Sequence, residues 1–200
     1  MDYIRLIRWK NLLLLTLMVA AVYWGLFYVM LHWGIKISDS ILLTQMHLVR
    51  NFVLLWLTEI CIAAGGYVVN DYFDTRIDEI NRPTRVIVGH TKTREQAARY
   101  FQLLWGIGIG LGLVLSWLLR SLTVGLIIVG VAGFLWFYSS SYKRQFLVGN
   151  LVVALCVFLA VFLTGQVVVD SLRVQFAEFS TDGRYEDFAT TRLPTRNWRL

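Results

Sequence analysis

Five long apolar segments constrain the fold of this chain more than any other feature of its sequence. Each is comparable to the roughly 20 residues that a helix needs to cross a bilayer. Because a bilayer offers no water to satisfy backbone polar groups, we expect each segment to be helical. The composition agrees, since 57% of the residues are hydrophobic and only 16% are charged, against about 25% charged in soluble domains. The sequence therefore predicts an all-α membrane protein, a polytopic bundle of transmembrane helices over residues 1–169. The segments are 12–31, 52–69, 100–119, 122–138 and 146–169.

The first apolar segment follows a basic stretch, as the apolar region of a secretory signal peptide does. However, segment 12–31 is longer than the roughly 7–15 residues of such a region, and no Ala-x-Ala cleavage site follows it. We therefore expect it to remain in the protein as a membrane helix.

The positive charges are distributed unevenly between the two sides of the predicted helices. The net charge of +6 could suggest nucleic acid as a partner. The cations instead concentrate before the first segment and in the loops after the second and fourth, which is the positive-inside pattern. We expect no nucleic-acid partner, and an integral protein of a bacterial-type plasma membrane with its N-terminus and these loops in the cytoplasm. The cations concerned are Arg5, Arg8, Lys10, Arg76, Arg82, Arg85, Lys92, Arg94, Arg99, Lys143 and Arg144.

Several glycines lie inside the predicted helices. A nucleotide-binding loop would need a strand before it, whereas these glycines lie within segments long enough to span a bilayer. Small residues that let helices approach closely are the better interpretation. The glycines are Gly106, Gly108, Gly110, Gly112, Gly125, Gly130 and Gly133.

Glu59 lies in the middle of the second apolar segment. An ionisable side chain at that depth is costly in lipid, so we expect it to face the bundle interior or a cavity. Two interpretations stay open: a protonated or hydrogen-bonded structural carboxyl group, and a side chain that belongs to a ligand pocket.

An acidic segment, Asn70-Asp71-Tyr72-Phe73-Asp74-Thr75-Arg76-Ile77-Asp78, follows the second apolar segment. If the helix continues through it, Asp71, Asp74 and Asp78 lie within an arc of about 60° on one face. Carboxylates at the membrane interface suit Mg²⁺, which usually takes one or two protein carboxylates together with water and phosphate oxygens. On spacing alone, a solvated acidic loop with arginines as surface partners remains an alternative.

The longer pattern resembles the first aspartate-rich motif of the UbiA family of membrane-embedded prenyltransferases. The pattern is Asn-Asp-x-x-Asp-x-x-x-Asp at 70–78, followed by Asn-Arg-Pro at 81–83. Two further stretches are similar to the family: 138–150, with Tyr-Ser-Ser-Ser-Tyr-Lys-Arg and a later Gly-Asn, and 8–11, with Arg-Trp-Lys-Asn. The resemblance covers roughly residues 5–169, about five of the family's usual nine helices. The family's second aspartate-rich motif does not occur in this sequence.

The resemblance implies transfer of a prenyl group from a prenyl pyrophosphate to an aromatic or polar lipid-precursor acceptor. It implies Mg²⁺ as cofactor, held by Asn70, Asp71, Asp74 and Asp78. It implies Asp71, Asp74 and Lys143 as catalytic residues. The substrate-binding residues that it implies are Arg8, Asn11, Arg82, Tyr138, Lys143 and Arg144. The sequence of residues 81–89 is more similar to that of family members that act on geranylgeranyl donors and polar lipid precursors than to that of enzymes that act on quinone rings. For Lys143 and Arg144 the alternative is a positive-inside anchor, and for Tyr138 it is an interfacial aromatic belt.

The end of the chain, residues 170–200, mixes acidic residues and arginines with few aliphatic residues and no periodicity. We expect a polar tail that is either disordered or the product of a frame shift, and an activity that truncation impairs. The alternative functions are a non-catalytic membrane protein that binds Mg²⁺-pyrophosphate, and an inactive fragment.

Overall fold

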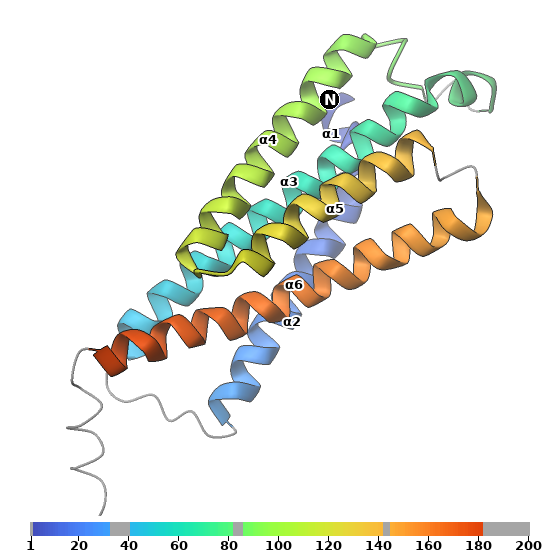
Figure 1. The fold of residues 1–200 in the computed structure, drawn as a ribbon. Helices are drawn as coiled ribbons and strands as arrows, with labels where there is room; N and C mark the ends of the chain where they lie inside the picture. Colours follow the sequence, from blue (N-terminus) through green and yellow to red (C-terminus); the bar gives the residue numbers. More distant parts are fainter. Residues whose placement is uncertain (1, 33–40, 82–85, 142–144, 182–200) are drawn as a thin grey trace, which may run out of the picture.

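The computed structural model describes residues 2–32, 41–81, 86–141 and 145–181 as a bundle of α-helices, with no β-strand among them. Each of the five predicted apolar segments corresponds to one long helix, and a short helix precedes them (Figure 1). The helices are α1 (Asp2–Leu6), α2 (Trp9–His32), α3 (Ile41–Asn81), α4 (Arg94–Leu118), α5 (Leu122–Ser140) and α6 (Phe146–Thr181).

The long helix α3 is the central element of the bundle, because it contacts every other helix. Around it, α2, α6, α5 and α4 follow one another, and each contacts the next. Figure 1 shows α3, α4 and α5 running alongside one another, with α1 beside the end of α3 that carries the acidic residues. The site described below is therefore built on the one helix that all the others hold in place.

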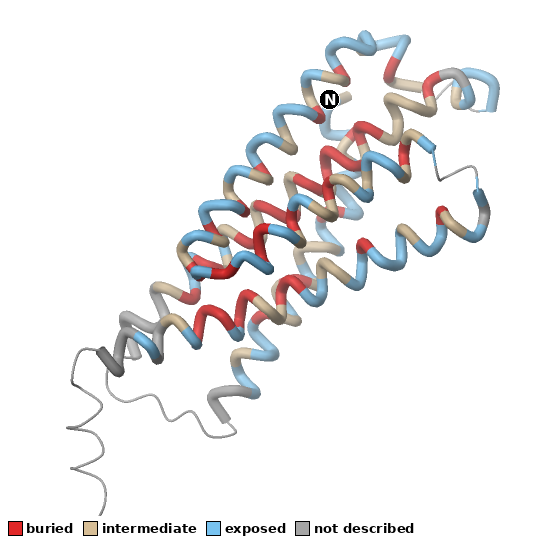
Figure 2. The backbone as a smooth tube through the Cα atoms, viewed as in Figure 1, coloured by how far each residue is buried: buried red, intermediate tan, exposed pale blue. Residues whose placement is uncertain are grey.

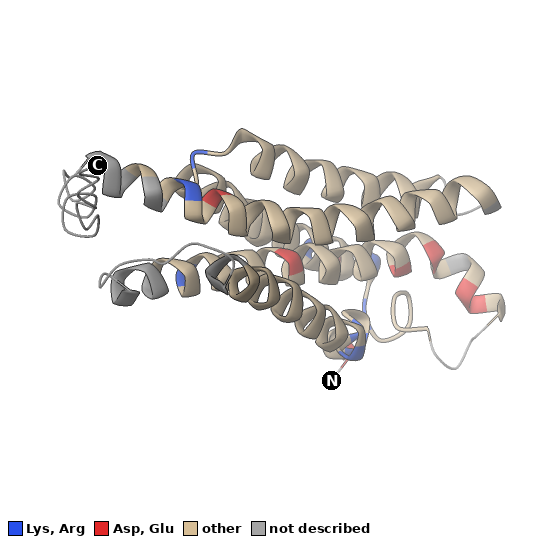
Figure 3. Ribbon diagram, turned by 90° about the horizontal axis from the view of Figure 1, so that it is seen from below, with Lys and Arg blue, Asp and Glu red and all other residues tan. Residues whose placement is uncertain are grey.

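Among the described residues, five helical segments are long and apolar enough to cross a membrane: Trp9–Val29, His47–Thr75, Arg94–Leu118, Leu122–Ser140 and Leu147–Val174. Their outward faces carry many exposed large apolar side chains, and the buried residues face the bundle interior (Figure 2). Charged residues gather toward the ends of the bundle, as Figure 3 shows. The predicted all-α polytopic membrane architecture is confirmed.

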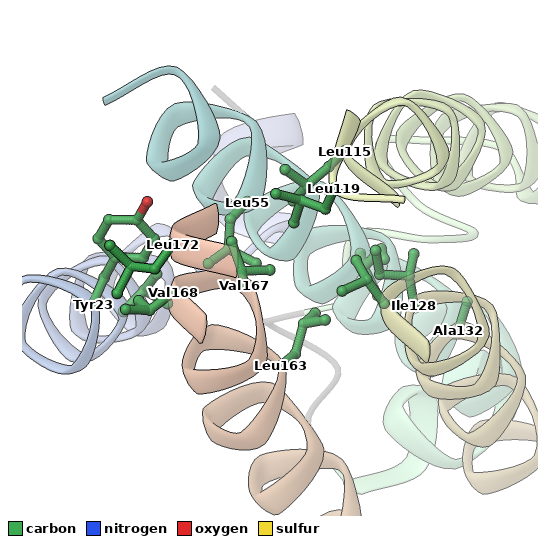
Figure 4. Packing of buried hydrophobic residues seen from close by; sticks show 13 residues of the cluster. Tyr23, Leu55, Leu115, Leu119, Ile128, Ala132, Leu163, Val167, Val168 and Leu172 are labelled. Atoms are coloured by element: carbon green, nitrogen blue, oxygen red, sulfur yellow. The ribbon is translucent and has the colours of Figure 1, made fainter. Parts of the chain in front are cut away.

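The bundle core lies where α2, α3, α5, α6 and the C-terminal end of α4 meet (Figure 4). Tyr23 of α2 is fully buried there and donates its hydroxyl hydrogen to the Leu48 carbonyl oxygen of α3 at 2.9 Å. On the same side, the Asn51 side-chain amide donates to the Ser171 hydroxyl at 2.9 Å. These buried polar groups are thus paired between helices, as burial requires.

The glycine prediction is confirmed for some positions and wrong for others. Gly108 and Gly112 are buried where α4 meets α3, and Gly125 lies against Ser116. A Cβ at Gly108 would lie 3.2 Å from the Thr58 backbone oxygen, which is closer than most Cβ contacts, so glycine favours this approach. By contrast, a Cβ would meet nothing within 4 Å at the other four predicted positions, which are Gly106, Gly110, Gly130 and Gly133.

The last helix extends beyond its predicted end. The predicted segment stops at Val169, whereas α6 continues to Thr181. The first polar residues after Val169, which are Asp170, Ser171 and Arg173, find partners within the bundle. Buried Asp170 accepts a hydrogen bond from the Gln166 amide at 3.0 Å and pairs with Arg173 at 3.4 Å. A polar composition therefore does not end this helix, because its charges are satisfied one turn away.

Candidate functional site

The acidic segment predicted from the sequence is the C-terminal part of α3, which continues without a break to Asn81. Successive turns of this helix present polar side chains to one cavity of about 960 Å³. The other walls come from α1, from the junction of α1 and α2, and from residues 86–91 after α3. The cavity residues contributed by α3 are Asn70, Asp71, Asp74, Asp78 and Asn81. We call this the polar cavity.

Arg8 joins α1 and α2 and points to α3. Its Nη2 donates to the Asp71 Oδ1 at 2.9 Å, and its guanidinium lies over the Tyr67 ring, 5.1 Å from the centroid. Its φ of 50° lies in the left-handed region, which is uncommon for a residue with a Cβ. Such a conformation persists only where its surroundings enforce it, and here the two contacts to α3 hold the side chain in place.

A second polar pair lies one turn along α3. The Asn70 side-chain amide donates to the Asp74 Oδ2 at 3.0 Å, across i and i+4. This bond orients the Asn70 amide oxygen and Asp74 relative to each other. The two members lie on the same face of the helix as Asp71 and Asp78, as the spacing predicts.

The turn after α3 forms another wall of the polar cavity. Gly89 has a φ of 95°, and a Cβ there would lie 3.1 Å from the Thr75 Cγ2, so the position requires glycine. The Lys92 ammonium lies 4.1 Å from the centroid of the Tyr3 ring in α1. These contacts hold α1 and the turn against the acidic end of α3.

A second cavity, of about 430 Å³, lies deeper in the bundle between α2, α3, α5 and α6, and we call it the apolar cavity. Most of its lining is aliphatic or aromatic, as is typical of pockets for lipid-like ligands. Tyr138 and Ser139 of α5 lie in its wall. Glu59 and Thr58 of α3 also line it.

The two cavities share two lining residues, Arg8 and Asn70. A ligand with an anionic head and a hydrocarbon tail could therefore place its head among the charges of the polar cavity and its tail in the apolar one. This amphipathic arrangement is the main chemical property of the site.

The charge balance of the polar cavity bears on which ions it can hold. Its described lining residues include four carboxylates, Asp2, Asp71, Asp74 and Asp78, and two guanidinium groups, Arg5 and Arg8. An anion would meet net negative charge there unless a cation accompanied it. Across the described ranges, no three Asp, Glu, His or Cys side chains gather closely enough to cage a metal by themselves. The residues fit Mg²⁺, which takes few protein ligands and fills its shell with water and phosphate oxygens.

The structure places the predicted site residues as follows. Asn70, Asp71, Asp74 and Asp78 line the polar cavity, Arg8 lies at the junction of the two cavities, and Tyr138 lines the apolar cavity. Asn11 is exposed and lines neither of the two cavities. The positions predicted for Arg82, Lys143 and Arg144 lie outside the described residues.

Besides Val86, Ile87 and Thr91 of the turn after α3, sequence reasoning missed three charged or amide residues of the polar cavity, Asp2, Arg5 and Asn81. Arg5 could have been identified together with Arg8, since both precede the first apolar segment and lie one helical turn apart. Asn81 belongs to the Asn-Arg-Pro that follows the acidic motif. Asp2 carried no signal, because its place depends on how α1 folds against the turn after α3.

Comparison with known proteins agrees with this architecture. The model of the UbiA prenyltransferase family matches residues 40–177. This match includes α3 with its whole acidic face, and it extends through α4 and α5 into α6.

The chain belongs to the UbiA prenyltransferase family. Among its relatives are UbiA-family proteins named digeranylgeranylglyceryl phosphate synthase. That of Sulfurisphaera tokodaii is 38% identical over 104 residues, 52% of this chain and 36% of the relative. That of Ignicoccus hospitalis is 38% identical over 93 residues, 46% of this chain and 29% of the relative. The chain thus spans about a third of the length of these curated relatives.

A solved structure from a study of digeranylgeranylglyceryl phosphate synthase in membranes has a similar fold. The TM-score is 0.64 at 22% sequence identity, and the match covers 95% of this chain and 64% of that one. The helix arrangement described above is therefore the UbiA arrangement.

The left-handed conformation of Arg8 gives a testable expectation for this UbiA-family chain. Glycine adopts a φ of 50° without strain, whereas alanine is strained there by roughly 1–2 kcal/mol, partly offset by the greater freedom of glycine when unfolded. Both Arg8→Gly and Arg8→Ala remove the Asp71 partner, so their difference isolates the backbone. We expect Arg8→Gly to be more stable by about 1 kcal/mol, measured by thermal unfolding in detergent. Equal stability would mean that the junction does not adopt this turn.

Proposed function

We propose that the chain binds a prenyl diphosphate together with Mg²⁺ and transfers its prenyl group to a lipid acceptor at the membrane surface. The observation that carries the proposal is that the polar and apolar cavities share Arg8 and Asn70. A prenyl diphosphate has the matching form, with an anionic head joined directly to a hydrocarbon tail. Family membership supports the same class of reaction.

In this proposal the diphosphate lies in the polar cavity. The guanidinium groups of Arg5 and Arg8 donate charged hydrogen bonds to it. Asn70, Asp71, Asp74 and Asp78 would hold Mg²⁺, which supplies charge neutralisation to a departing diphosphate. The donor's C1–oxygen bond breaks, and the electron pair leaves with the diphosphate. A hydroxyl oxygen of the acceptor forms the new bond to C1 and releases its proton to the diphosphate or solvent.

The apolar cavity serves the reaction by excluding water. A prenyl group that loses its diphosphate develops positive charge at C1, and water would capture it. The aliphatic walls around Ile62, Leu135 and Leu163 keep the tail in a dry environment. The Tyr138 ring lines this cavity and offers a π face to such a cation.

The names of the relatives suggest the substrates. They are named for digeranylgeranylglyceryl phosphate as product, so we propose a geranylgeranyl donor and a glyceryl phosphate acceptor that already carries one geranylgeranyl chain. The distribution of positive charge supports a cytoplasmic position for the polar cavity.

The test is a transfer assay with the purified full chain in lipid vesicles, using labelled geranylgeranyl diphosphate and the glyceryl phosphate acceptor. We expect labelled product with Mg²⁺, loss of product after chelation, and recovery when Mg²⁺ is added back. Because the polar cavity is net negative among its described residues, donor binding should fall with chelation as well. Turnover that is insensitive to chelation would contradict the metal assignment.

A second candidate function is binding without transfer, for which the carboxylates and guanidinium groups of the polar cavity would suffice. The same vesicles distinguish the two candidates. Mg²⁺-dependent donor binding with no product from any acceptor would favour the binding function and contradict the transferase proposal for this chain.

A further inference from the structure

The apolar cavity has an unusual polar end. On α3 its lining runs from Asn70, which it shares with the polar cavity, down to Glu59 and Thr58. Glu59 is only 7% exposed and lies in the middle of a membrane-spanning helix. Its Oε1 lies 3.3 Å from the Thr164 hydroxyl of α6. Glu59 Oε2 and Thr58 Oγ1 are buried and have no hydrogen-bond partner within the described part of the chain.

Two unpartnered polar atoms in such a place need an explanation, because buried polar groups are almost always paired. A carboxyl group at this depth is also costly in its own right. An aliphatic side chain would fill the same place without either penalty, so the polarity of this end requires a reason beyond packing.

The distance from the shared end to Glu59 suggests that reason. Asn70 lies eleven positions after Glu59 along the helix, which corresponds to about 16 Å at 1.5 Å per residue. An extended hydrocarbon advances roughly 1.25 Å per carbon, given C–C bonds of about 1.5 Å. A tail that enters beside Asn70 therefore reaches Glu59 after about 13 chain carbons, within the fourth isoprene unit.

We infer that Glu59, together with Thr58, sets an upper limit on the length of the isoprenoid tail that the apolar cavity accepts. This inference rests on the proposed function, since it assigns the tail of the donor to this cavity. A tail that ends near the fourth unit leaves Oε2 and Oγ1 open to a small polar molecule such as water. A longer tail would cover both atoms with hydrocarbon, which offers them no hydrogen bond.

The experiment measures binding rather than turnover. Non-hydrolysable thiodiphosphate analogues of farnesyl, geranylgeranyl and geranylfarnesyl diphosphate, with three, four and five isoprene units, are titrated against the full chain with Mg²⁺. The wild-type chain should bind the four-unit analogue more tightly than the five-unit one. Glu59→Leu removes the polar atoms at similar volume, and it should improve five-unit binding relative to four-unit binding by about tenfold. Glu59→Gln keeps a polar end and should leave the ratio near that of the wild type.

Thr58→Val tests the same inference independently, in case the Glu59 variants do not fold. It replaces a single hydroxyl by a methyl group of similar size, and it should shift the ratio in the same direction by a smaller factor. If Glu59→Leu, Thr58→Val and Glu59→Gln all keep the wild-type ratio, the inference is overturned and the proposed function stands. If no analogue of any length binds the wild-type chain, the proposed function itself fails, and the inference with it.

Discussion

Replacing Asp74 with asparagine should reduce prenyl transfer by about a hundredfold or more, the usual cost of removing one charge-stabilising group from an active site. Asp74 lines the polar cavity, where its Oδ2 accepts from the Asn70 amide. Asparagine keeps the size of the side chain but cannot neutralise a divalent cation. The measurement is the rate of labelled product formation in vesicles at saturating donor, with donor affinity determined separately as a function of Mg²⁺.

Glu95 provides the matched control for Asp74. It is also a carboxylate at this end of the bundle, but it lies in the first turn of α4 with its side chain 84% exposed and paired with Arg99. Glu95→Gln removes the same charge, and an exposed pair of this kind contributes little to stability. We expect activity near that of the wild type. Transfer that survives Asp74→Asn unchanged would contradict the role assigned to the acidic face of α3.

The acidic face of α3 could be predicted from the sequence because it depends on one helix alone. Once the helix continues past the apolar segment, the spacing of Asp71, Asp74 and Asp78 places them on one side. The ion pair between Arg8 and Asp71 is different, since these residues are 63 positions apart. It depends on a left-handed residue at the junction of α1 and α2, and no periodicity in the sequence encodes that turn.

The two cavities could not be predicted from the sequence, for a related reason. Glu59 could be identified as a buried ionisable residue, but whether it faces a cavity depends on how α2, α5 and α6 surround α3. Likewise, no feature of the sequence singled out Gly65, although a Cβ there would collide with the Trp105 ring of α4. The Trp105 indole nitrogen donates to the Ile62 carbonyl oxygen at 3.0 Å, so this close approach fixes α4 against α3.

The glycines of α4 show where prediction from sequence alone ends. A substitution at one of them is also expected to have a large effect on stability. Gly106 and Gly110 are four residues apart, and so are Gly108 and Gly112. The sequence therefore offers two equivalent glycine faces. The structure turns one toward α3 and leaves the other open.

Gly108→Leu should destabilise the bundle by about 3 kcal/mol or more, the upper part of the usual range for overpacking. A Cβ at Gly108 would lie 3.0 Å from the Cys61 Cβ and 3.2 Å from the Thr58 backbone oxygen. Because backbone atoms cannot move aside as a flexible side chain can, α4 must separate from α3. Gly106→Leu is the control: the same substitution, on the same helix, where a Cβ meets nothing within 4 Å.

Thermal unfolding of both variants in detergent tests the prediction, and donor binding extends it to the site. Thr58 faces α4, since a Cβ at Gly112 would lie 3.1 Å from its Cγ2, and it also lines the apolar cavity. Displacing α4 should therefore also weaken donor binding in Gly108→Leu. Gly106→Leu should keep both properties, because its side chain faces outward, as the lipid-facing residues of α4 do. Equal melting temperatures for the two variants would show that α4 does not approach α3 through Gly108. The Trp105 contacts with Gly65 and Ile62 would then be the ones that hold α4 against α3.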